Sequence, residues 1–286
     1  MNGNLSLKNP YIVGMPIKRK EYLFGREEVF NQIDSYLSQN KQAIFLYGQR
    51  RIGKTSVLQQ IPGFCKLSNY NFVYFDCQAF AEINHEDSSN LLEEIIFDLM
   101  ETIASDAPSN TSNLLEFVQQ YRDSHSYISK SDFWLLFNQF INLFFHNTNG
   151  NPLVLLLDEL DALDTAISQK GNVRFFSFLK KAMSDDGRLF ALSELLSENE
   201  SESIKISFLA TEDAKKLISE LNKITISEQA NERRDFLEYQ QGGVDYILRL
   251  TSNHPYFIQG ICSQIFDYAK DNHRYQISKR EVKENI

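Results

Sequence analysis

The residues best suited to chemistry form a short glycine-containing stretch near position 50. The stretch reads GQRRIGKTS and consists of Gly48, Gln49, Arg50, Arg51, Ile52, Gly53, Lys54, Thr55 and Ser56. It fits the pattern GxxxxGK followed by Thr or Ser. The glycines let successive backbone N–H groups curve around a phosphate, Lys54 neutralises phosphate charge, and the Thr55 hydroxyl suits a magnesium ligand. The stretch therefore predicts binding of a nucleoside triphosphate, ATP with Mg²⁺.

A second stretch supplies the acidic groups that such a metal site requires. The aliphatic run Leu153 to Leu157 is followed directly by Asp158 and Glu159. We expect Asp158 to hold Mg²⁺, directly or through water, and Glu159 to polarise the attacking water, with Lys54 completing the catalytic set. Two other interpretations stay open. Asp158 could be a strand-end turn residue, and Glu159 a helix-start acid with little catalytic role.

The elements around the glycine-containing stretch suit that chemistry. The run from Ala43 to Tyr47 is short, apolar and rich in β-formers, and it stops at Gly48. Apolar residues at helical spacing resume beyond Lys54. A helix that begins there would direct the positive end of its dipole at the same phosphates. This order of strand, turn and helix argues against a chance match in an unrelated turn.

Strands and helices alternate through most of the chain. We expect helices beginning near Arg26 and at about 91–103, 114–121 and 133–145, and buried strands at 72–75 and 153–157. The run 153–157 is apolar at every position, which is typical of a central parallel strand covered on both faces. The pattern therefore predicts an α/β fold with a parallel sheet.

The two ends of the chain follow different patterns. Residues 1–22 contain Pro10, Gly14 and Pro16 without sustained periodicity, and we expect an extended arm. Residues 192–203 are weakly patterned, and 204–208 fits a last strand. A helical second domain is expected from about Ala210, with helices near 211–221, 244–250 and 255–269 and from 278 onward.

Composition limits the possible partners. The chain has 29 basic and 38 acidic side chains and a net charge of −9, so nucleic acid binding would need a local basic patch. Three cysteines without CxxC spacing suggest neither a disulfide framework nor a zinc site, which favours a reducing, cytoplasmic compartment. The first residues lack the layout of a signal peptide, and no apolar run is long enough to span a membrane.

Five segments together resemble the STAND class of NTPases, signal-transduction ATPases with numerous domains in the AAA+-like P-loop lineage. The similarity is greatest to the archaeal and bacterial branch often called archaeal-type ATPases. It covers most of residues 10–270. The matching segments are FGRE at 24–27, GQRRIGKTS, LVLLLDEL, SFLATEDAKKLI and LTSNHPYFIQGIC. The FGRE and HPYFIQ elements in this order are much more specific than the two Walker motifs.

The resemblance implies four regions. They are an arm near the adenine (1–23), a P-loop α/β core (24–208), a helical lid (209–273) and the start of a winged helix (274–286). It implies base or ribose contacts near Ile12, Val13, Phe24 and Arg26, and a lid helix that starts at Pro255 and closes over the nucleotide. His254 would touch phosphate or act as a sensor. Arg26 as a surface charge and His254 as a structural residue remain open.

Three further features have no single assignment. Arg50 and Arg51 would meet phosphate or a neighbouring subunit, or simply lie in solvent. The class has a core strand after the Walker B helix that ends in a polar sensor residue, and here RLFA passes almost at once into LSELLSENESES, so that strand looks truncated or missing. Arg174 lies in the region of a trans-acting arginine, but no arginine finger is assigned.

Our hypothesis is an ATP-binding, slowly hydrolysing molecular switch. Its nucleotide state, ATP or ADP, would control the lid position and homo-oligomer formation, in signalling or antiviral defence as is typical of the class, with an output domain expected beyond residue 286. One rival is a DNA-associated initiator-like ATPase, disfavoured by the acidic charge. Another is a scaffold that holds ADP without turnover.

Overall fold

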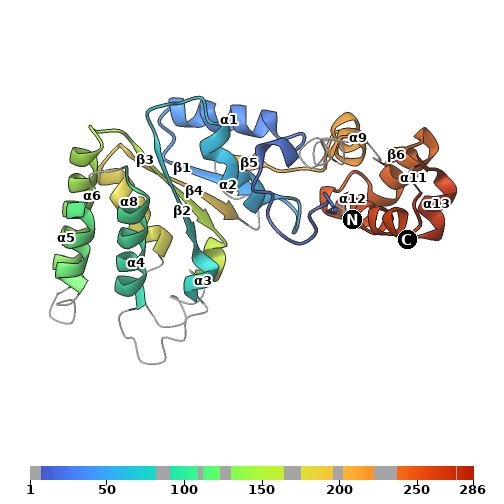
Figure 1. Cartoon of the computed structure of the whole chain (residues 1–286). Coiled ribbons are helices and arrows are strands. Elements are labelled where there is room, and N and C mark those ends of the chain that lie inside the picture. The colour runs from blue at the N-terminus through green and yellow to red at the C-terminus, as the bar shows by residue number, and fades with distance from the viewer. Residues whose placement is uncertain are drawn as a thin grey trace. The chain divides into compact units, whose positions relative to one another are not determined.

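The computed structural model describes residues 8–81, 91–108, 112–122, 130–163, 175–195, 202–221, 237–274 and 276–286 (Figure 1). In the first part of the chain its elements are η1 (Lys20–Tyr22), α1 (Glu27–Ser38), β1 (Ala43–Tyr47), α2 (Lys54–Phe64), β2 (Asn71–Asp76), α3 (Cys77–Ala81), α4 (Leu91–Asp106), α5 (Ser112–Arg122), α6 (Lys130–Asn147) and β3 (Leu153–Asp158). Further along are α8 (Phe175–Asp185), β4 (Leu189–Leu195), β5 (Ser203–Lys205), α9 (Thr211–Ser219), β6 (Glu238–Tyr239), α11 (Gln241–Thr251), α12 (Pro255–Asp271), β7 (Gln276–Ile277) and α13 (Lys279–Glu284). Arg174 lies outside the described residues.

The chain divides into two compact units, each built from separate segments. The sheet unit comprises Asn31–Tyr47 and Phe64–Ile204. The phosphate-loop unit comprises Met1–Phe30, Gly48–Gly63 and Lys205–Ile286. The glycine-containing loop therefore belongs to the same unit as the N-terminal arm and the C-terminal helices.

The sheet has five strands in the order β2-β3-β4-β1-β5. β2 pairs with β3, β3 with β4 and β4 with β1, all in parallel. β3 is buried at all six positions, because both faces of this strand are covered. Leu153, Leu155 and Leu157 point into one apolar core, which also contains buried residues of α4, α5, α6 and α8. The predicted α/β fold with a parallel sheet is confirmed.

The expectation that one core strand is truncated or missing is wrong. β4 runs for seven residues between β3 and β1, with Ala191 paired to Leu155 on one side and to Ala43 on the other. Its second half contains Ser193, with no exposed surface, and Glu194, which is 7% exposed. Two buried polar residues in succession give this half of the strand the appearance of a polar loop in the sequence. The strand expected at 204–208 is shorter and starts earlier, as β5.

The phosphate-loop unit has its own apolar core. α9, α11, α12 and α13 supply most of it, and Tyr11, Ile17 and Tyr22 of the arm complete it. The Tyr11 hydroxyl donates a hydrogen bond of 2.7 Å to the carbonyl of Ile218. Residues 8–19 of the arm form no helix or strand, η1 follows at Lys20–Tyr22, and three arm residues are buried in this core. Within the described parts of the chain, no helix has the length and apolarity needed to cross a membrane.

Candidate functional site

The loop from Gly48 to Thr55 follows β1 directly and leads into α2, as the sequence predicts. Gly53 has φ +101°, and Arg51 has φ +62°, a left-handed conformation that is uncommon for a residue with a side chain. A Cβ atom at Gly48 would lie 2.4 Å from the carbonyl oxygen of Ile206. Only glycine fits at that position, because backbone atoms there cannot give way.

Lys54 is the first residue of α2 and is 9% exposed. Its ammonium lies 3.4 Å from the carbonyl oxygen of Gly48 and 3.5 Å from that of Gln49, so it is folded back over the loop. Thr55 is half-buried beside it. The start of α2 therefore combines a cation, a hydroxyl and the positive end of a helix dipole, which suits a bound phosphate.

Ser56 has a different role from its neighbours. Its hydroxyl accepts a hydrogen bond of 2.9 Å from the backbone N–H of Ile17. Gln60, one turn further along α2, donates one of 2.7 Å to the Ile17 carbonyl. Both contacts bind the N-terminal arm to the helix that follows the loop. The Ser56 hydroxyl therefore has a structural role in holding the arm against α2.

Arg26 is buried, at 5% exposure, and supports the loop. Its guanidinium donates hydrogen bonds of 3.0 Å to the carbonyl of Ile52 and 2.9 Å to that of Ser207. Burial lowers the pKa of Arg26 to about 10, and the carboxylates of Asp213 and Glu27 oppose the shift. The side chain is still a cation at neutral pH. These contacts disagree with Arg26 as a surface charge and make it a positioning residue of the loop.

The other residues expected near the adenine lie on the arm or beside it. The Ile12 backbone N–H donates to the Gln259 side chain of α12 at 2.7 Å. Val13 is 40% exposed, and Phe24 packs against the core of the phosphate-loop unit. Their contact with a base or ribose stays a prediction.

Helix α12 begins at Pro255, as the sequence predicts. The two residues at 252 and 253 both have left-handed backbones, with φ of 49° and 62°, so the chain turns sharply just before the helix. His254 is 6% exposed, and its ring lies 5.3 Å from that of Phe208 and 4.8 Å from that of Phe257. Burial, and then the charge of Arg26, lower the pKa of His254, while a backbone hydrogen bond at Arg50 opposes this.

The Nδ1 atom of His254 is buried and has no hydrogen-bond partner among the described residues. Leaving such an atom unsatisfied costs about 1–3 kcal/mol. A ligand that accepts or donates a hydrogen bond at this atom would remove the cost. Contact between His254 and a bound nucleotide stays a prediction, and the two ring contacts show that His254 also has a packing role.

Arg51 of the phosphate loop contacts the first turn of α12. Its guanidinium donates a hydrogen bond of 2.8 Å to the Tyr256 hydroxyl and lies 4.6 Å from the centre of the same ring. Its neighbour Arg50 is exposed. Tyr256 was not predicted as a site residue, because an aromatic residue after proline carries no recognised signal. Arg51 in this structure therefore contacts a residue of α12 in its own chain.

The acidic residues lie at the carboxyl end of β3. Asp158 is 4% exposed, and its Oδ2 accepts a hydrogen bond of 2.6 Å from the Tyr74 hydroxyl. Glu159, the next residue, is exposed and has a left-handed backbone with φ 52°. Asp76 lies opposite Asp158 in the pairing of β2 with β3, but its Oδ1 accepts from the backbone N–H groups of residues 78 and 79 at the start of α3.

The donor types fit the expected metal. The Thr55 hydroxyl, in the phosphate-loop unit, and the Asp158 carboxylate, in the sheet unit, are each of the hard oxygen type that Mg²⁺ prefers. That they hold one metal together stays a prediction. The metal would neutralise phosphate charge and polarise a phosphoryl oxygen. The exposed carboxylate of Glu159 is free to meet water, as its expected role requires.

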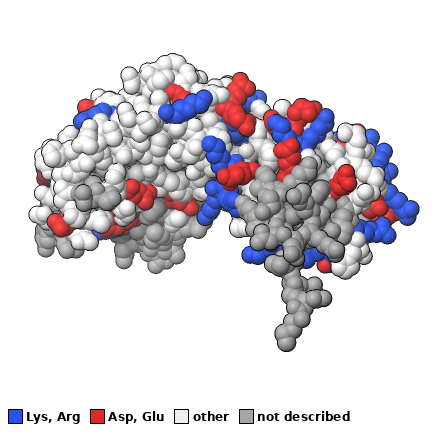
Figure 2. All heavy atoms as spheres, turned by 45° about the horizontal axis from the view of Figure 1, so that its top comes forward, with Lys and Arg blue, Asp and Glu red and all other residues white. Residues whose placement is uncertain are grey.

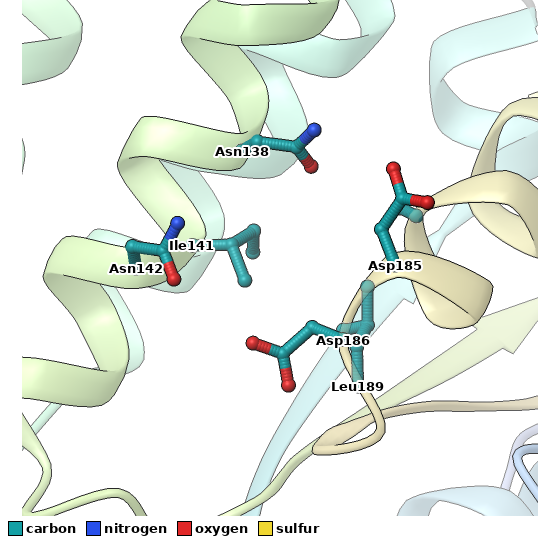
Figure 3. Close-up of a pocket in the computed structure, with 7 residues that line it drawn as sticks. Asn138, Ile141, Asn142, Asp185, Asp186 and Leu189 are labelled. Atoms are coloured by element: carbon teal, nitrogen blue, oxygen red, sulfur yellow. The ribbon is translucent and has the colours of Figure 1, made fainter.

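A hollow elsewhere in the sheet unit is separate from these residues (Figure 3). It is lined by residues of α6 and α8 and by the residues leading into β4, namely Asn138, Ile141, Asn142, Ala182, Asp185, Asp186 and Leu189. It lies at the amino end of β4, whereas Asp158 lies at the carboxyl end of β3, which is parallel to β4. Asp186 is also engaged by Arg188 at 2.7 Å. None of the predicted site residues lines this hollow.

The parallel sheet and the loop that follows β1 define the chain as a P-loop protein of the α/β class. It belongs to the AAA ATPase domain family, whose model matches residues 22–204, more than half of the chain. Membership in that family implies nucleotide binding, usually with Mg²⁺. No curated protein sequence matches the chain.

Three solved structures share the fold at low sequence identity. Drosophila ORC bound to DNA has a TM-score of 0.56 and 12% identity over 98% of this chain, which spans 64% of that ORC chain. A Walker-type ATPase of Pyrococcus abyssi has a TM-score of 0.58 and 13% identity over 91% of this chain and 74% of its own. The Thermotoga maritima RuvB Holliday junction branch migration motor has a TM-score of 0.53 and 14% identity over 94% of this chain and 71% of its own.

Proposed function

We propose that the chain is an ATP-driven molecular switch in which the phosphate loop reports the nucleotide state to the lid helix α12. The observation that carries the proposal is the contact between Arg51 and Tyr256. A loop side chain and the first turn of the lid are linked by one hydrogen bond and one cation–π contact. A ligand that engages Arg51 would change that link directly.

The direction of the switch follows from competition. A bound γ-phosphate carries more negative charge than the neutral Tyr256 hydroxyl, so the Arg51 guanidinium would favour the phosphate. The lid would then lose one of its contacts to the loop, while His254 gains a ligand for its unpartnered nitrogen. ATP and ADP would differ in these contacts, and such differential contacts are what shifts a two-state equilibrium.

The remaining parts follow the chemistry of the class. Lys54 and the loop amides would bind the phosphates, Thr55 and Asp158 would hold Mg²⁺, and Glu159 would direct water in a slow hydrolysis that resets the switch. Nucleotide-dependent association of several copies would carry the signal onward. The STAND resemblance supports a role in signalling or defence in the cytoplasm.

The link to the lid predicts an effect of Tyr256→Phe that is specific to ATP. The variant keeps the ring but loses the hydrogen bond to Arg51, which is worth about 1 kcal/mol. Because the γ-phosphate no longer competes with that bond, ATP is expected to bind about fivefold more tightly, while ADP affinity changes by less than about twofold. Equilibrium titration with both nucleotides measures the difference.

Tyr268→Phe is the matched control, because it removes a hydroxyl from the same helix more than three turns away. It is expected to leave both affinities unchanged. An equal change for ATP and ADP in Tyr256→Phe, or no change for either, would contradict the role of this contact.

A second candidate, a DNA-associated ATPase, is favoured by one surface feature. Arg249, Lys279 and Lys283 surround the Tyr246 ring, with their charged groups 5.2, 5.8 and 5.6 Å from its centre. No carboxylate of the described residues forms an ion pair with these three cations. Nearby Glu281 and Glu284 are engaged by Arg274 and Arg280. Such a cluster suits a polyanion, and one of the similar structures is ORC bound to DNA.

The charge of the whole chain argues against this candidate. The net charge is −9, and basic and acidic side chains are intermingled on the face drawn in Figure 2. If DNA binds at the cluster, its affinity falls as salt rises, and changing all three cations to Ala reduces the slope of log affinity against log salt by about three. Filter binding across salt concentrations measures this. Absence of salt-sensitive binding by the unaltered protein would remove the candidate.

A further inference from the structure

We propose that Tyr74 is a positioning residue for the magnesium site, acting through Asp158. The proposal rests on the proposed function, because it assumes that Asp158 holds Mg²⁺ when the nucleotide binds. It adds a residue that the sequence motifs do not contain. Tyr74 lies on β2, two residues before the end of the strand, outside both Walker motifs.

The pairing of β2 with β3 brings the two side chains to the same face of the sheet. Tyr74 lies opposite Leu156, and Asp76 lies opposite Asp158. Side chains alternate between faces along a strand, so Leu156 and Asp158 lie on the same face of the sheet. Tyr74 lies on that face too, because it is paired with Leu156. Asp158 is the diagonal neighbour of Tyr74, and the long aromatic side chain spans the distance between the strands to reach it. A shorter hydroxyl residue at position 74 would not reach.

The hydrogen bond itself is of the strong kind. The Tyr74 hydroxyl donates to Asp158 Oδ2 at 2.6 Å, within the range of about 2.5–2.7 Å for bonds from a hydroxyl to a charged carboxylate. Asp158 is 4% exposed, so water competes little for that oxygen. The bond fixes the rotation of the carboxylate group before any metal arrives.

Fixing a ligand in advance favours metal binding. Side chains that hydrogen-bond to a metal ligand orient it, and removing one typically costs about 10- to 100-fold in metal affinity or activity. The bond to Tyr74 also gives the buried carboxyl group of Asp158 a hydrogen-bond donor, and buried polar groups need such partners. Tyr74 would therefore raise the affinity for Mg²⁺ without touching the metal, the nucleotide or the reacting atoms.

The test compares nucleotide binding with and without the metal. Tyr74→Phe keeps the ring and removes only the donor. We expect the Mg²⁺ concentration that gives half of the metal-dependent increase in ATP affinity to rise by about tenfold, at the lower limit for such residues. ATP affinity in EDTA is expected to stay within about twofold of the unaltered protein. Titration of a fluorescent ATP analogue at a series of Mg²⁺ concentrations measures both quantities.

Two further variants make the result decisive. Tyr70→Phe is the matched control: Tyr70 directly precedes the same strand, and its hydroxyl donates to the Leu37 carbonyl at 3.3 Å, so its loss is expected to leave the Mg²⁺ midpoint unchanged. Asp158→Ala is expected to abolish the dependence on Mg²⁺. The melting temperature of each variant confirms that it folds.

The outcomes separate the two proposals. An unchanged Mg²⁺ midpoint in Tyr74→Phe, while Asp158→Ala loses its Mg²⁺ dependence, would overturn the role of Tyr74 alone. Normal Mg²⁺ dependence in Asp158→Ala, or no ATP binding by the unaltered protein, would overturn the metal assignment and the role of Tyr74 together. An equal loss of ATP affinity with and without Mg²⁺ in Tyr74→Phe would reduce Tyr74 to a structural residue.

Discussion

Replacing Lys54 with Ala is expected to weaken ATP binding by at least about a hundredfold. Hydrogen bonds to charged groups contribute about 1.5–3 kcal/mol each, and the ammonium would make at least two of them to the phosphates. Lys54 is 9% exposed, and its ammonium lies over the carbonyls of Gly48 and Gln49, the part of the loop that phosphate would occupy. No other lysine belongs to the loop.

Isothermal titration of the variant with Mg²⁺ and ATP measures this loss. Lys66→Ala is a suitable control, because Lys66 is an exposed lysine that contacts Asn31 in the sheet unit. It removes the same charge and is expected to leave ATP affinity unchanged. Retention of normal ATP affinity in Lys54→Ala would contradict the assignment of the loop as the phosphate-binding site.

Replacing Glu159 with Gln is expected to slow ATP hydrolysis by about 10²- to 10⁴-fold, the usual contribution of a general base. The amide has nearly the same shape as the carboxylate but cannot take a proton from water. Glu159 is exposed and lies outside the phosphate loop, so ATP affinity is expected to stay within about threefold. Phosphate release and ATP binding, measured on the same preparation, separate the two effects.

The same experiment distinguishes a switch from a scaffold that only holds ADP. A switch requires measurable phosphate release in the unaltered protein and trapped ATP in Glu159→Gln. Asp161→Asn, a carboxylate-to-amide change two residues further along the chain, is the control and is expected to turn over normally. Equal phosphate release in Glu159→Gln and the unaltered protein would remove Glu159 from the reaction, and no release in either would favour the scaffold.

The phosphate loop between β1 and α2 and the buried strand β3 were predictable because each has a local signal. Glycines at 48 and 53 with Lys54 and Thr55 are required by phosphate geometry, so residue type and spacing suffice. The run Leu153–Leu157 is apolar at each position because β3 is covered on both faces. In both cases the structural requirement falls on residues that are adjacent in the sequence, so it can be recognised from a short segment.

The contacts that join distant segments were not predictable in the same way. β4 contains Ser193 and Glu194 at buried positions between two strands, so its polarity hides a central strand. The sequence pattern places Arg26 at the start of a helix, but its guanidinium donates hydrogen bonds to the carbonyls of Ile52 and Ser207. Tyr74 belongs to no motif, and its bond to Asp158 depends on the register between β2 and β3. Each of these depends on pairing across the fold.

Residues Gly48 to Thr55 are proposed to bind the phosphates of Mg·ATP and to pass the nucleotide state to the lid. Hydrogen exchange of the backbone amides, compared between the nucleotide-free, ADP-bound and ATP-bound protein, measures both effects. We expect both nucleotides to slow exchange in the loop and in the first turn of α2. The first turn of α12, from Pro255 onward, is expected to differ between ATP and ADP. Unchanged exchange in the loop at saturating Mg·ATP would contradict the claim.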